Sequence, residues 1–443
     1  MAKIVFMGAG STVFARNVIG DCMCREALKD SEFVLYDIDA ERLKESEFIL
    51  NVINKNINDG RAKISTALGV KNRRKALQGA DFVINAIQVG GYEPSTVIDV
   101  EIPKKYGLRQ TIADTLGIGG IFRGLRTIPV MLDFARDMEA VAPNAWFLNY
   151  TNPMAMLTGA MLQGTSVKTV GLCHSVQVCV ESLLGALGLE NTQERRDKIQ
   201  SKIAGINHMA WLLQLRDKDG NDLYPEIRRK ALEKNRTEKH KDMVRFSYIN
   251  HLGYYCTESS EHNAEYNPLF IKSRYPDMIE DLQIPLDEYP RRCIEQINGW
   301  KEEKEKILAD GKITHERSKE YASYIMESIV TNVPYKIGGN VLNHGLIDNL
   351  PADACVEVPC LVDGSGITPC HVGRLPEQCA AMNRTNINVQ LLTIKAARTR
   401  KKEDIYRAAM LDPHTAAELN IDDIVKMCDE LIEAHGEYMN MYR

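Results

Sequence analysis

A glycine-rich turn after the first apolar segment constrains the fold more than any other feature of this chain. Residues 3–7 form a short, largely apolar segment typical of a buried strand, and Gly8-Ala-Gly-Ser11 follows it directly. The residues after Ser11 place apolar side chains at helical spacing. This strand–turn–helix order predicts a dinucleotide site, in which the turn and the start of the helix bind a pyrophosphate.

The residues expected to bind the dinucleotide belong to this turn and to the end of the next strand. They are Gly8, Gly10, Ser11, Thr12 and Asp37. Asp37 follows the second predicted strand, residues 33–36, where a carboxylate accepts hydrogen bonds from ribose hydroxyls and repels a 2′-phosphate, which favours NAD over NADP. Val13 stands where such turns commonly have a third glycine, so an ordinary strand-to-helix turn is the alternative.

Short apolar segments continue to alternate with helical patterns up to about residue 190. Further strands are expected at residues 81–87, 146–148 and 169–172. This order predicts an α/β fold, with a Rossmann-like, doubly wound parallel sheet over residues 1–190. Because the alternation then weakens, residues 191–443 are expected to form an α+β domain for substrate binding and oligomerisation. A helix is expected over residues 376–410.

Composition and charge exclude several classes of protein. The 443 residues carry a formal net charge of −5, and Lys and Arg are spread along the chain, so neither nucleic acid nor an anionic membrane is an expected partner. The first residues lack the pattern of a secretory signal, and apolar runs stay short of a membrane span. The 11 cysteines lack C-x-x-C spacing, which favours free thiols in a cytoplasmic protein.

Cys173 and His208 are the candidate metal ligands. Cys173 follows the strand expected at 169–172 and so lies at the carboxyl edge of the sheet, where ligands bind in open α/β folds. Spacing alone does not establish a metal site, because a lone buried Cys or His is more often structural. One thiolate and one imidazole would leave a divalent ion such as Mn²⁺ with open positions for two vicinal sugar hydroxyls.

Further polar segments are candidates for substrate chemistry. Asp114 lies in a glycine-rich loop, where a helix cap or a turn residue is the alternative role. Asn149 and Asn152 follow the strand expected at 146–148 and can offer amides to sugar hydroxyls or to the nicotinamide, or simply form a turn. Residues 253–266 are dense in ionisable side chains, so acid and base candidates are expected there.

Taken together, these motifs resemble glycoside hydrolase family 4, most closely its α-galactosidase branch of the melibiase type. The resemblance covers nearly the whole chain and is carried by residues 6–12, 110–115, 119–123, 149–154, 171–176, 205–210, 257–262 and 412–417. In this family the tetrapeptide that begins at the metal cysteine sorts substrates, and Cys173-His-Ser-Val176 resembles the type for unphosphorylated α-galactosides. Ile118 departs from the proline common in the family, which affects loop stiffness more than chemistry.

The resemblance implies a glycosidase that requires NAD and a divalent metal. In this family NAD⁺ takes a hydride from C3 of the sugar, a base removes the C2 proton, and the leaving oxygen departs from C1. By resemblance, the metal held by Cys173 and His208 stabilises the enolate, and His174 is the acid. The residues expected to contact the substrate are Arg123, Asn149 and Asn152.

The base stays open among three residues. Related members use a tyrosine, and an acidic residue at the position of Asp114 is thought to raise its basicity. Tyr254 is the first candidate here, and Tyr255 and Glu261 are the alternatives.

Two kinds of alternative function also stay open. Within the family, the substrate can be an α-glucoside or an α-galacturonide. A 2-hydroxyacid dehydrogenase would share the sheet, the glycine turn and an Asn-Pro after a strand, but it does not explain Cys173 beside His174. The expected partners are a small α-galactoside and further copies of the chain, as a homodimer or homotetramer.

Overall fold

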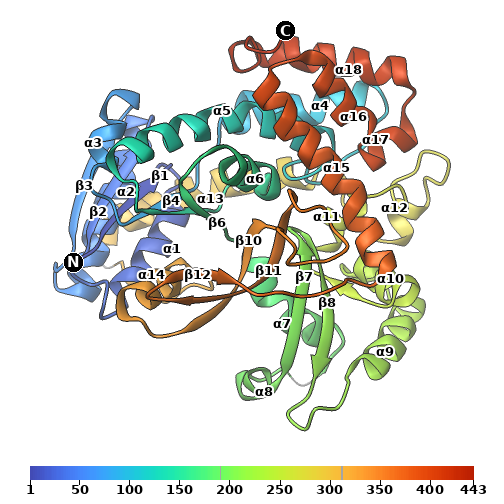
Figure 1. The fold of residues 1–443 in the computed structure, drawn as a ribbon, viewed down its shortest axis with the longest axis horizontal. Helices are drawn as coiled ribbons and strands as arrows, with labels where there is room; N and C mark the ends of the chain where they lie inside the picture. Colours follow the sequence, from blue (N-terminus) through green and yellow to red (C-terminus); the bar gives the residue numbers. More distant parts are fainter. Residues whose placement is uncertain (190, 311–312) are drawn as a thin grey trace.

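The computed structural model describes residues 1–189, 191–310 and 313–443 as a mixed α/β protein built on one large sheet (Figure 1). The strands are β1 (Lys3–Met7), β2 (Glu32–Asp37), β3 (Lys63–Leu68), β4 (Phe82–Asn85), β5 (Trp146–Asn149), β6 (Lys168–Gly171), β7 (Gln200–Ile206), β8 (Met209–Arg216), β9 (Tyr255–Cys256), β10 (Tyr335–Leu342), β11 (Cys355–Asp363) and β12 (Gly366–Pro369). Their order is β3-β2-β1-β4-β5-β6-β10-β11-β7-β8-β9, and β12 pairs with β11.

Strands β1 to β6 are parallel and confirm the predicted Rossmann-like, doubly wound fold. Neighbouring strands pair over four to six residues each. The strands expected at 3–7, 33–36, 81–87, 146–148 and 169–172 are all present, with ends that differ by at most two residues. They were predictable because their residues are almost entirely buried, which requires continuous apolar segments.

Strand β3 was missed by the sequence analysis. It lies at the edge of the sheet, and its six residues, Lys-Ile-Ser-Thr-Ala-Leu, are exposed or half-buried. An edge strand with an exposed surface does not need the apolar segment that marks a buried parallel strand.

The later strands extend the same sheet by antiparallel pairing. β10 joins β6 through one residue pair, Asn340 with Gly171, and β11 joins β7 through one pair, Glu357 with Gly205. By contrast, β10 and β11 pair with each other over eight residues. Strands from both sides of residue 190 therefore belong to one sheet, and the division into domains at that residue stays a prediction.

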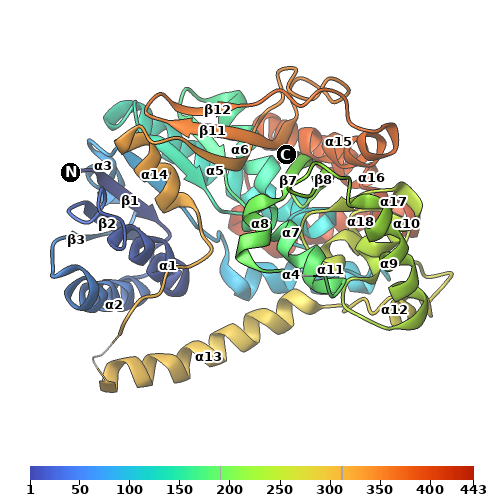
Figure 2. The ribbon, with the colours of Figure 1, turned by 90° about the horizontal axis from the view of Figure 1, so that it is seen from below.

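Helices lie on both sides of the parallel strands (Figures 1 and 2). They are α1 (Thr12–Met23), α2 (Ala40–Asn58), α3 (Arg73–Leu77), α4 (Val97–Lys105), α5 (Gly117–Val141), α6 (Met154–Gly164), α7 (His174–Ala186), α8 (Gln193–Lys198), α9 (Tyr224–Thr237), α10 (Met243–Leu252), α11 (Ser260–Glu265), α12 (Met278–Asp281), α13 (Glu288–Asp310), α14 (Ala322–Thr331), α15 (Glu377–Thr399), α16 (Lys402–Met410), α17 (Pro413–Glu418) and α18 (Ile421–His435). Short helical turns lie at Val70–Asn72, Gly91–Thr96 and Gly436–Tyr438.

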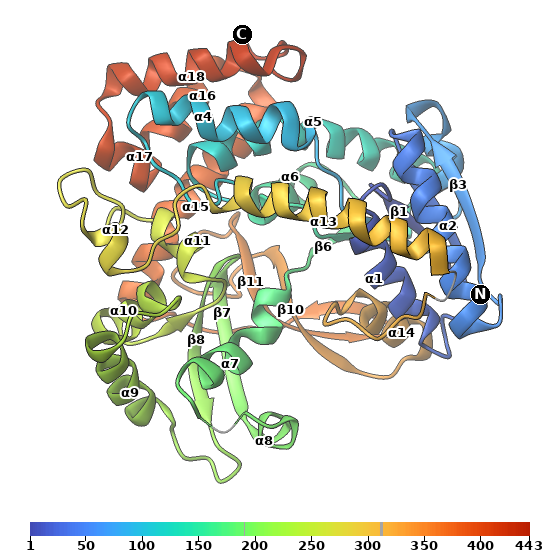
Figure 3. The same cartoon turned by 180° about the vertical axis from the view of Figure 1, so that it is seen from behind.

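Helix α13 lies along the outside of the molecule, from the side of α12 towards α2 (Figures 2 and 3). Towards its C-terminal end, the Trp300 indole donates to the Glu45 carboxylate of α2 (3.2 Å), and Lys304 forms an ion pair with the same carboxylate. Helix α13 thus contacts α2, a helix that belongs to the half of the chain with the parallel strands β1 to β6.

The single helix expected over residues 376–410 was wrong, because it is two helices, α15 and α16. Arg400 breaks it with a left-handed backbone (φ 59°). The amide of Arg443 donates to the Arg400 carbonyl (2.9 Å), and the amide of Lys402 donates to the Arg443 carbonyl (3.0 Å). Hydrogen bonds from the C-terminal residue thus replace helical ones at a position that has neither glycine nor proline.

The largest apolar core cluster draws on both halves of the chain, for example Phe6 and Phe147 with Val358 and Ile394. All eleven cysteines are free thiols, as expected. In the part of the chain that the structure describes, each helix is too short or too polar to cross a membrane.

Candidate active site

The predicted dinucleotide turn lies between β1 and α1, at the carboxyl ends of the parallel strands. Gly8 has a φ of +88°, and a Cβ there would lie 2.7 Å from the carbonyl oxygen of Ala86, so the position requires glycine. The amide of Gly10 donates to Oδ2 of Asp37 (2.6 Å). Asp37 therefore ties the glycine turn to the end of β2.

The other predicted residues around this turn differ in their burial and in the hydrogen bonds that they make within the protein. Ser11 is exposed at the start of α1, whereas Thr12 is buried and hydrogen bonded to Ser46 of α2 (3.0 Å). Oδ1 of Asp37 accepts the backbone amides of the next two residues (2.7 and 2.9 Å). Because amides in the first turn of a helix lack intrahelical acceptors, this end of α1 can bind a pyrophosphate.

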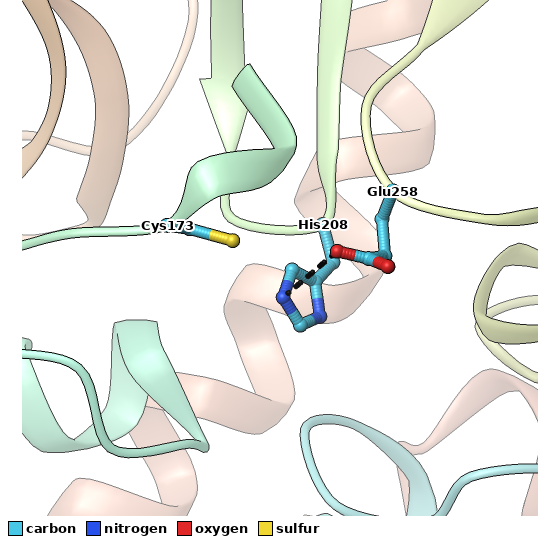
Figure 4. Close-up of side chains that lie close together, drawn as sticks. All are labelled: Cys173, His208 and Glu258. Atoms are coloured by element: carbon cyan, nitrogen blue, oxygen red, sulfur yellow. Dashed lines mark ion pairs between the residues drawn. The ribbon is translucent and has the colours of Figure 1, made fainter. Parts of the chain in front are cut away.

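Cys173, His208 and Glu258 converge at the other side of the site (Figure 4). One ligand atom from each, a sulfur, a nitrogen and an oxygen, lie within 4.8 Å of one another. Cys173 lies between β6 and α7, His208 in the turn between β7 and β8, and Glu258 just after β9. The structure thus brings the two predicted metal ligands together and adds a third, which the sequence analysis did not single out.

The protonation states of these three groups suit a buried cation site. Burial raises the pKa of the Cys173 thiol well above its usual value, and Glu258 adds to the rise. Burial lowers the pKa of His208 to about 4, so its imidazole is neutral at pH 7 and has a free lone pair. Burial disfavours ionised Glu258, but the imidazoles around it, foremost His262, outweigh burial and lower its pKa. This sulfur, nitrogen and oxygen set fits a divalent first-row ion, which binds the thiolate in place of the proton.

Two of the three groups have a left-handed backbone, with φ of 65° at His208 and 64° at Glu258. This conformation is costly for residues other than glycine and persists where the surrounding structure enforces it, often at functional sites. The buried amide Nδ2 of Asn263 lies within hydrogen-bond distance of the carbonyl oxygens of His208 (3.3 Å), Thr257 (3.1 Å) and Ser259 (3.0 Å). Asn263 therefore fixes both turns at once.

Two further side chains surround the candidate ligands. His262 lies beside Glu258 (Nδ1–Oε1 3.6 Å) and faces Asp114 (Nε2–Oδ1 4.0 Å). The Tyr266 hydroxyl lies 3.1 Å from Nδ1 of His208, which leaves Nε2 directed to Glu258 at 3.5 Å. The density of ionisable residues in 253–266 signalled this segment, but nothing in the sequence selected these two residues from it.

Asp114, Asn152 and Arg123, three residues predicted from the sequence, lie together next to this cluster. Nδ2 of Asn152 donates to Asp114 (3.3 Å), and Nε of Arg123 donates to the Asn152 carbonyl (3.1 Å). Arg123 also donates to the Tyr289 hydroxyl (3.3 Å) at the start of α13. Burial disfavours ionised Asp114, but Arg123 and His262 outweigh it, so the pKa of Asp114 is lowered. The group offers a carboxylate, an amide and a guanidinium to a polar ligand.

Glu265 holds the loop that carries Asp114. Its buried carboxylate accepts the backbone amides of Thr111 (2.8 Å) and Ala113 (2.9 Å). Burial raises the pKa of Glu265 to about 7, although these amides act in the opposite direction. The loop itself turns through a left-handed residue, Ala113, with φ of 58°.

The three residues predicted as candidates for the base lie in different surroundings. The Tyr255 hydroxyl is buried and donates to Asp242 (2.6 Å). Glu261 forms an ion pair with Arg292 of α13. Tyr254 is half-buried, with its ring packed on a neighbouring tyrosine. Tyr255 and Glu261 are thus engaged by protein partners, and the identity of the base stays a prediction.

His174 and Asn149 differ in how far the protein engages their side chains. His174 begins α7 directly after Cys173 and is exposed. Asn149 is fully buried, and its oxygen accepts from the Asn85 amide (2.9 Å) and from the backbone of Thr151 (3.1 Å). These contacts give Asn149 a role in shaping the loop, and its contact with substrate stays a prediction.

Known proteins match the chain over its whole length. The model of "Family 4 glycosyl hydrolase" matches residues 3–189, and that of the "Family 4 glycosyl hydrolase C-terminal domain" matches residues 203–415. An alpha-galactosidase of Bacillus subtilis (strain 168) is 62% identical over 444 residues, which cover 100% of both chains. An alpha-galactosidase of Rhizobium meliloti (strain 1021) is 35% identical, covering 99% of this chain and 89% of that one.

The fold is also that of a solved glycosidase. A 6-phospho-alpha-glucosidase from gut microorganisms, solved in complex with NAD and Mn²⁺, has a TM-score of 0.79 at 20% identity, over 99% of this chain and 98% of that chain. Sequence matches at both ends, the dinucleotide-type sheet and the shared architecture agree with one another. The chain is therefore a glycosidase that belongs to glycosyl hydrolase family 4, as its motifs had indicated.

Proposed function

We propose that this enzyme hydrolyses terminal α-galactosides with NAD⁺ and a divalent metal ion such as Mn²⁺. The observation that carries the proposal is the group of Cys173, His208 and Glu258 at the carboxyl edge of a sheet whose first turn fits a dinucleotide. The 62% identity to an alpha-galactosidase supports the choice of sugar.

Each side of the site would hold one cofactor. When bound, NAD⁺ supplies a hydride acceptor for C3 of the sugar, and the divalent ion supplies positive charge that stabilises the negative charge developing next to it. The glycine turn, the start of α1 and Asp37 bind the dinucleotide. Cys173, His208 and Glu258 hold the ion, and Tyr266 fixes the His208 ring through Nδ1.

Side chains around these cofactors bind the sugar and move its protons. Asp114, Asn152 and Arg123 would hydrogen bond its hydroxyls, and Asn149 would shape the loop beside them. His174, exposed and adjacent to Cys173, donates a proton to the leaving oxygen at C1.

Tyr266 joins Tyr254 as a candidate for the base that removes the C2 proton. Its hydroxyl lies 3.1 Å from the His208 ring, and the charge of Asp114 acts on it. Burial raises the pKa of Tyr266 well above its usual value, with Asp114 adding to the rise, so the hydroxyl is protonated until the positive charge of an ion bound beside it would lower this pKa. This agrees with a role for Asp114 in raising the basicity of a tyrosine.

The substrate and cofactors are tested together by hydrolysis of 4-nitrophenyl α-galactoside with and without NAD⁺ and Mn²⁺. The corresponding α-glucoside and α-galacturonide are assayed alongside it. We expect hydrolysis of the galactoside to require both cofactors. Faster hydrolysis of either alternative sugar would replace the proposed substrate, and undiminished hydrolysis in protein stripped of NAD⁺ would overturn the redox route.

The route is tested separately by the fate of the C2 proton. If a side chain in exchange with solvent removes and returns this proton, turnover in D₂O leaves deuterium at C2 of the released galactose. Direct displacement at C1 leaves the C2–H bond intact. NMR of the product distinguishes the two. The proposal also includes a cytoplasmic, homo-oligomeric enzyme, whose assembly size-exclusion chromatography with light scattering measures.

A further inference from the structure

The two candidate metal ligands of the sheet edge come from strands that do not touch each other. Cys173 follows β6 and His208 follows β7, and β10 and β11 lie between these strands in the sheet. The distance between the two ligands therefore depends on how the intervening strands are attached on each side.

Each attachment is a single residue pair, and the two pairs lie in one row across the sheet. Gly171 of β6 pairs with Asn340 of β10, Asn340 pairs with Glu357 of β11, and Glu357 pairs with Gly205 of β7. Cys173 follows Gly171 by two residues, and His208 follows Gly205 by three.

Side chains reinforce this row. Nδ2 of Asn340 donates both to the Gly171 carbonyl (3.2 Å) and to Oε1 of Glu357 (3.0 Å). Asn340 and Glu357 are 0% and 1% exposed. Gly171 leaves room for Asn340, since a Cβ on Gly171 would lie 2.8 Å from Cβ of Asn340.

The row has more polar groups than packing alone requires. The side chain of Asn207, the residue before His208, interacts with the Glu357 carboxylate, and neither Oε2 of Glu357 nor the Asn207 amide has a further hydrogen-bond partner among the described residues. Burying such groups is costly, so a purely structural strand junction would favour apolar residues. Glu357 also lies close enough to the site for its charge to act on the Cys173 thiol.

We infer that Asn340 and Glu357 are positioning residues that set the separation between Cys173 and His208. The bridge from Gly171 through Asn340 and Glu357 to Gly205 holds the two ligand loops at the spacing that a divalent ion requires. This inference rests on the proposed metal site and adds to it two residues outside the set of candidate ligands.

The test measures the affinity for Mn²⁺ directly, by the electron paramagnetic resonance signal of the free ion. Loss of partners that orient metal ligands typically weakens metal binding by roughly 10- to 100-fold. We expect this range for Glu357→Ala and for Asn340→Ala, with the dissociation constant for NAD⁺ changed less than about threefold. Glu357→Gln keeps an acceptor for Asn340 and should retain most of the affinity.

A spectroscopic measurement separates positioning from loss of fold. In the Co²⁺-loaded protein, the absorption band of a thiolate bound to Co²⁺ reports contact between Cys173 and the ion. We expect this band to weaken in both alanine variants and to persist in Glu357→Gln. Asn343→Ala is the matched control, because Asn343 is a buried asparagine that donates to the carbonyls of residues 347, 350 and 351, outside the row. It should lower thermal stability and leave Mn²⁺ affinity unchanged.

Each outcome has a defined meaning. Unchanged Mn²⁺ affinity and an unchanged Co²⁺ band in folded Glu357→Ala and Asn340→Ala would overturn the inference. So would failure of both variants to fold, since the pair would then be a folding element. Cys173→Ser and His208→Ala separate this result from failure of the proposed function, because unchanged Mn²⁺ affinity in those variants would remove the metal site itself.

Discussion

The dinucleotide side and the metal side of the site are built in different ways. The dinucleotide side combines one glycine turn, which offers mainly backbone atoms, with one carboxylate at the end of the next strand, as when the Gly10 amide donates to Asp37. The metal side gathers side chains from distant turns, the buried Cys173 and His208 and the half-buried Glu258, with the buried Glu357 behind them. A backbone-built site requires glycines at fixed spacing, whereas a site built from side chains depends on how distant segments meet.

The largest effect is expected on the metal side. Cys173→Ser and His208→Ala each remove a ligand atom, so Mn²⁺-dependent hydrolysis should fall by a factor on the order of 10³ or more. NAD⁺ binding should change little, because the ligands belong to the other side of the site. Titration calorimetry with NAD⁺ and the rate of nitrophenol release measure the two separately. Full activity in Cys173→Ser would contradict the assignment.

A comparison of two tyrosines tests which one is the base. General-base catalysis contributes roughly 10²- to 10⁴-fold, so loss of the base should lower kcat by about this factor with little change in KM. We expect the loss for Tyr266→Phe, and a small effect for Tyr254→Phe. Glycosides with a deuterium at C2 should show a larger isotope effect in the impaired variant. The opposite ranking of the two variants would assign the base to Tyr254.

On the dinucleotide side, a smaller effect is expected from one carboxylate. Asp37→Ala removes an acceptor of the ribose hydroxyls and of the Gly10 amide, so the dissociation constant for NAD⁺ should rise by about one to two orders of magnitude. Mn²⁺ affinity should stay the same. Asp39→Ala is a control, because Asp39 caps α2 through its own side chain. An unchanged NAD⁺ affinity in Asp37→Ala would mean that another residue holds the ribose.

The smallest effect is a pH dependence of stability from Glu265. Its pKa is raised from 4.5 to about 7 by burial, so between these values the folded protein binds more protons than the unfolded chain. The free energy of unfolding therefore falls as pH rises through this window, by about 3 kcal/mol for a single group with this shift. Glu265→Gln should flatten the decrease in melting temperature between pH 5 and pH 8.

A second carboxyl provides the control for this measurement. The pKa of Asp404 is lowered to about 2, burial being outweighed by Thr399, Arg407 and Lys395, so its contribution is lost only below its ordinary value of 3.8. Asp404→Asn should lower the melting temperature without changing its slope between pH 5 and pH 8. An unaltered slope in Glu265→Gln would show that Glu265 is ionised throughout this range.

The parts of the fold that depend on residues close together in the sequence were predictable. Buried parallel strands need continuous apolar residues, and Gly8 cannot carry a side chain against Ala86, so β1, β2 and the turn were all predictable. The break at Arg400 was not, because it depends on hydrogen bonds with the C-terminal residue.

The site was predictable in composition but not in detail. Cys173 and His208 were found through motif resemblance, while Glu258 depends on a left-handed turn that points its carboxylate at them. Tyr266 lies twelve residues after Tyr254 in the same ionisable segment, and only the packing of α11 and its neighbours brings its hydroxyl to His208. Tertiary contacts, and not the local sequence, determine which of several similar residues reaches the site.

The left-handed backbone at Ala113, His208 and Glu258 has an evolutionary consequence. Glycine at each position would relieve about 1 kcal/mol or more of conformational cost, so stabilising mutations are available inside the active site. At residue 113 the exchange removes one methyl group, whereas at residues 208 and 258 it removes a side chain of the metal site. If His208 and Glu258 hold the ion as proposed, a lineage selected for heat resistance alone would drift towards a robust but inactive homologue, and only selection for activity would retain the two residues.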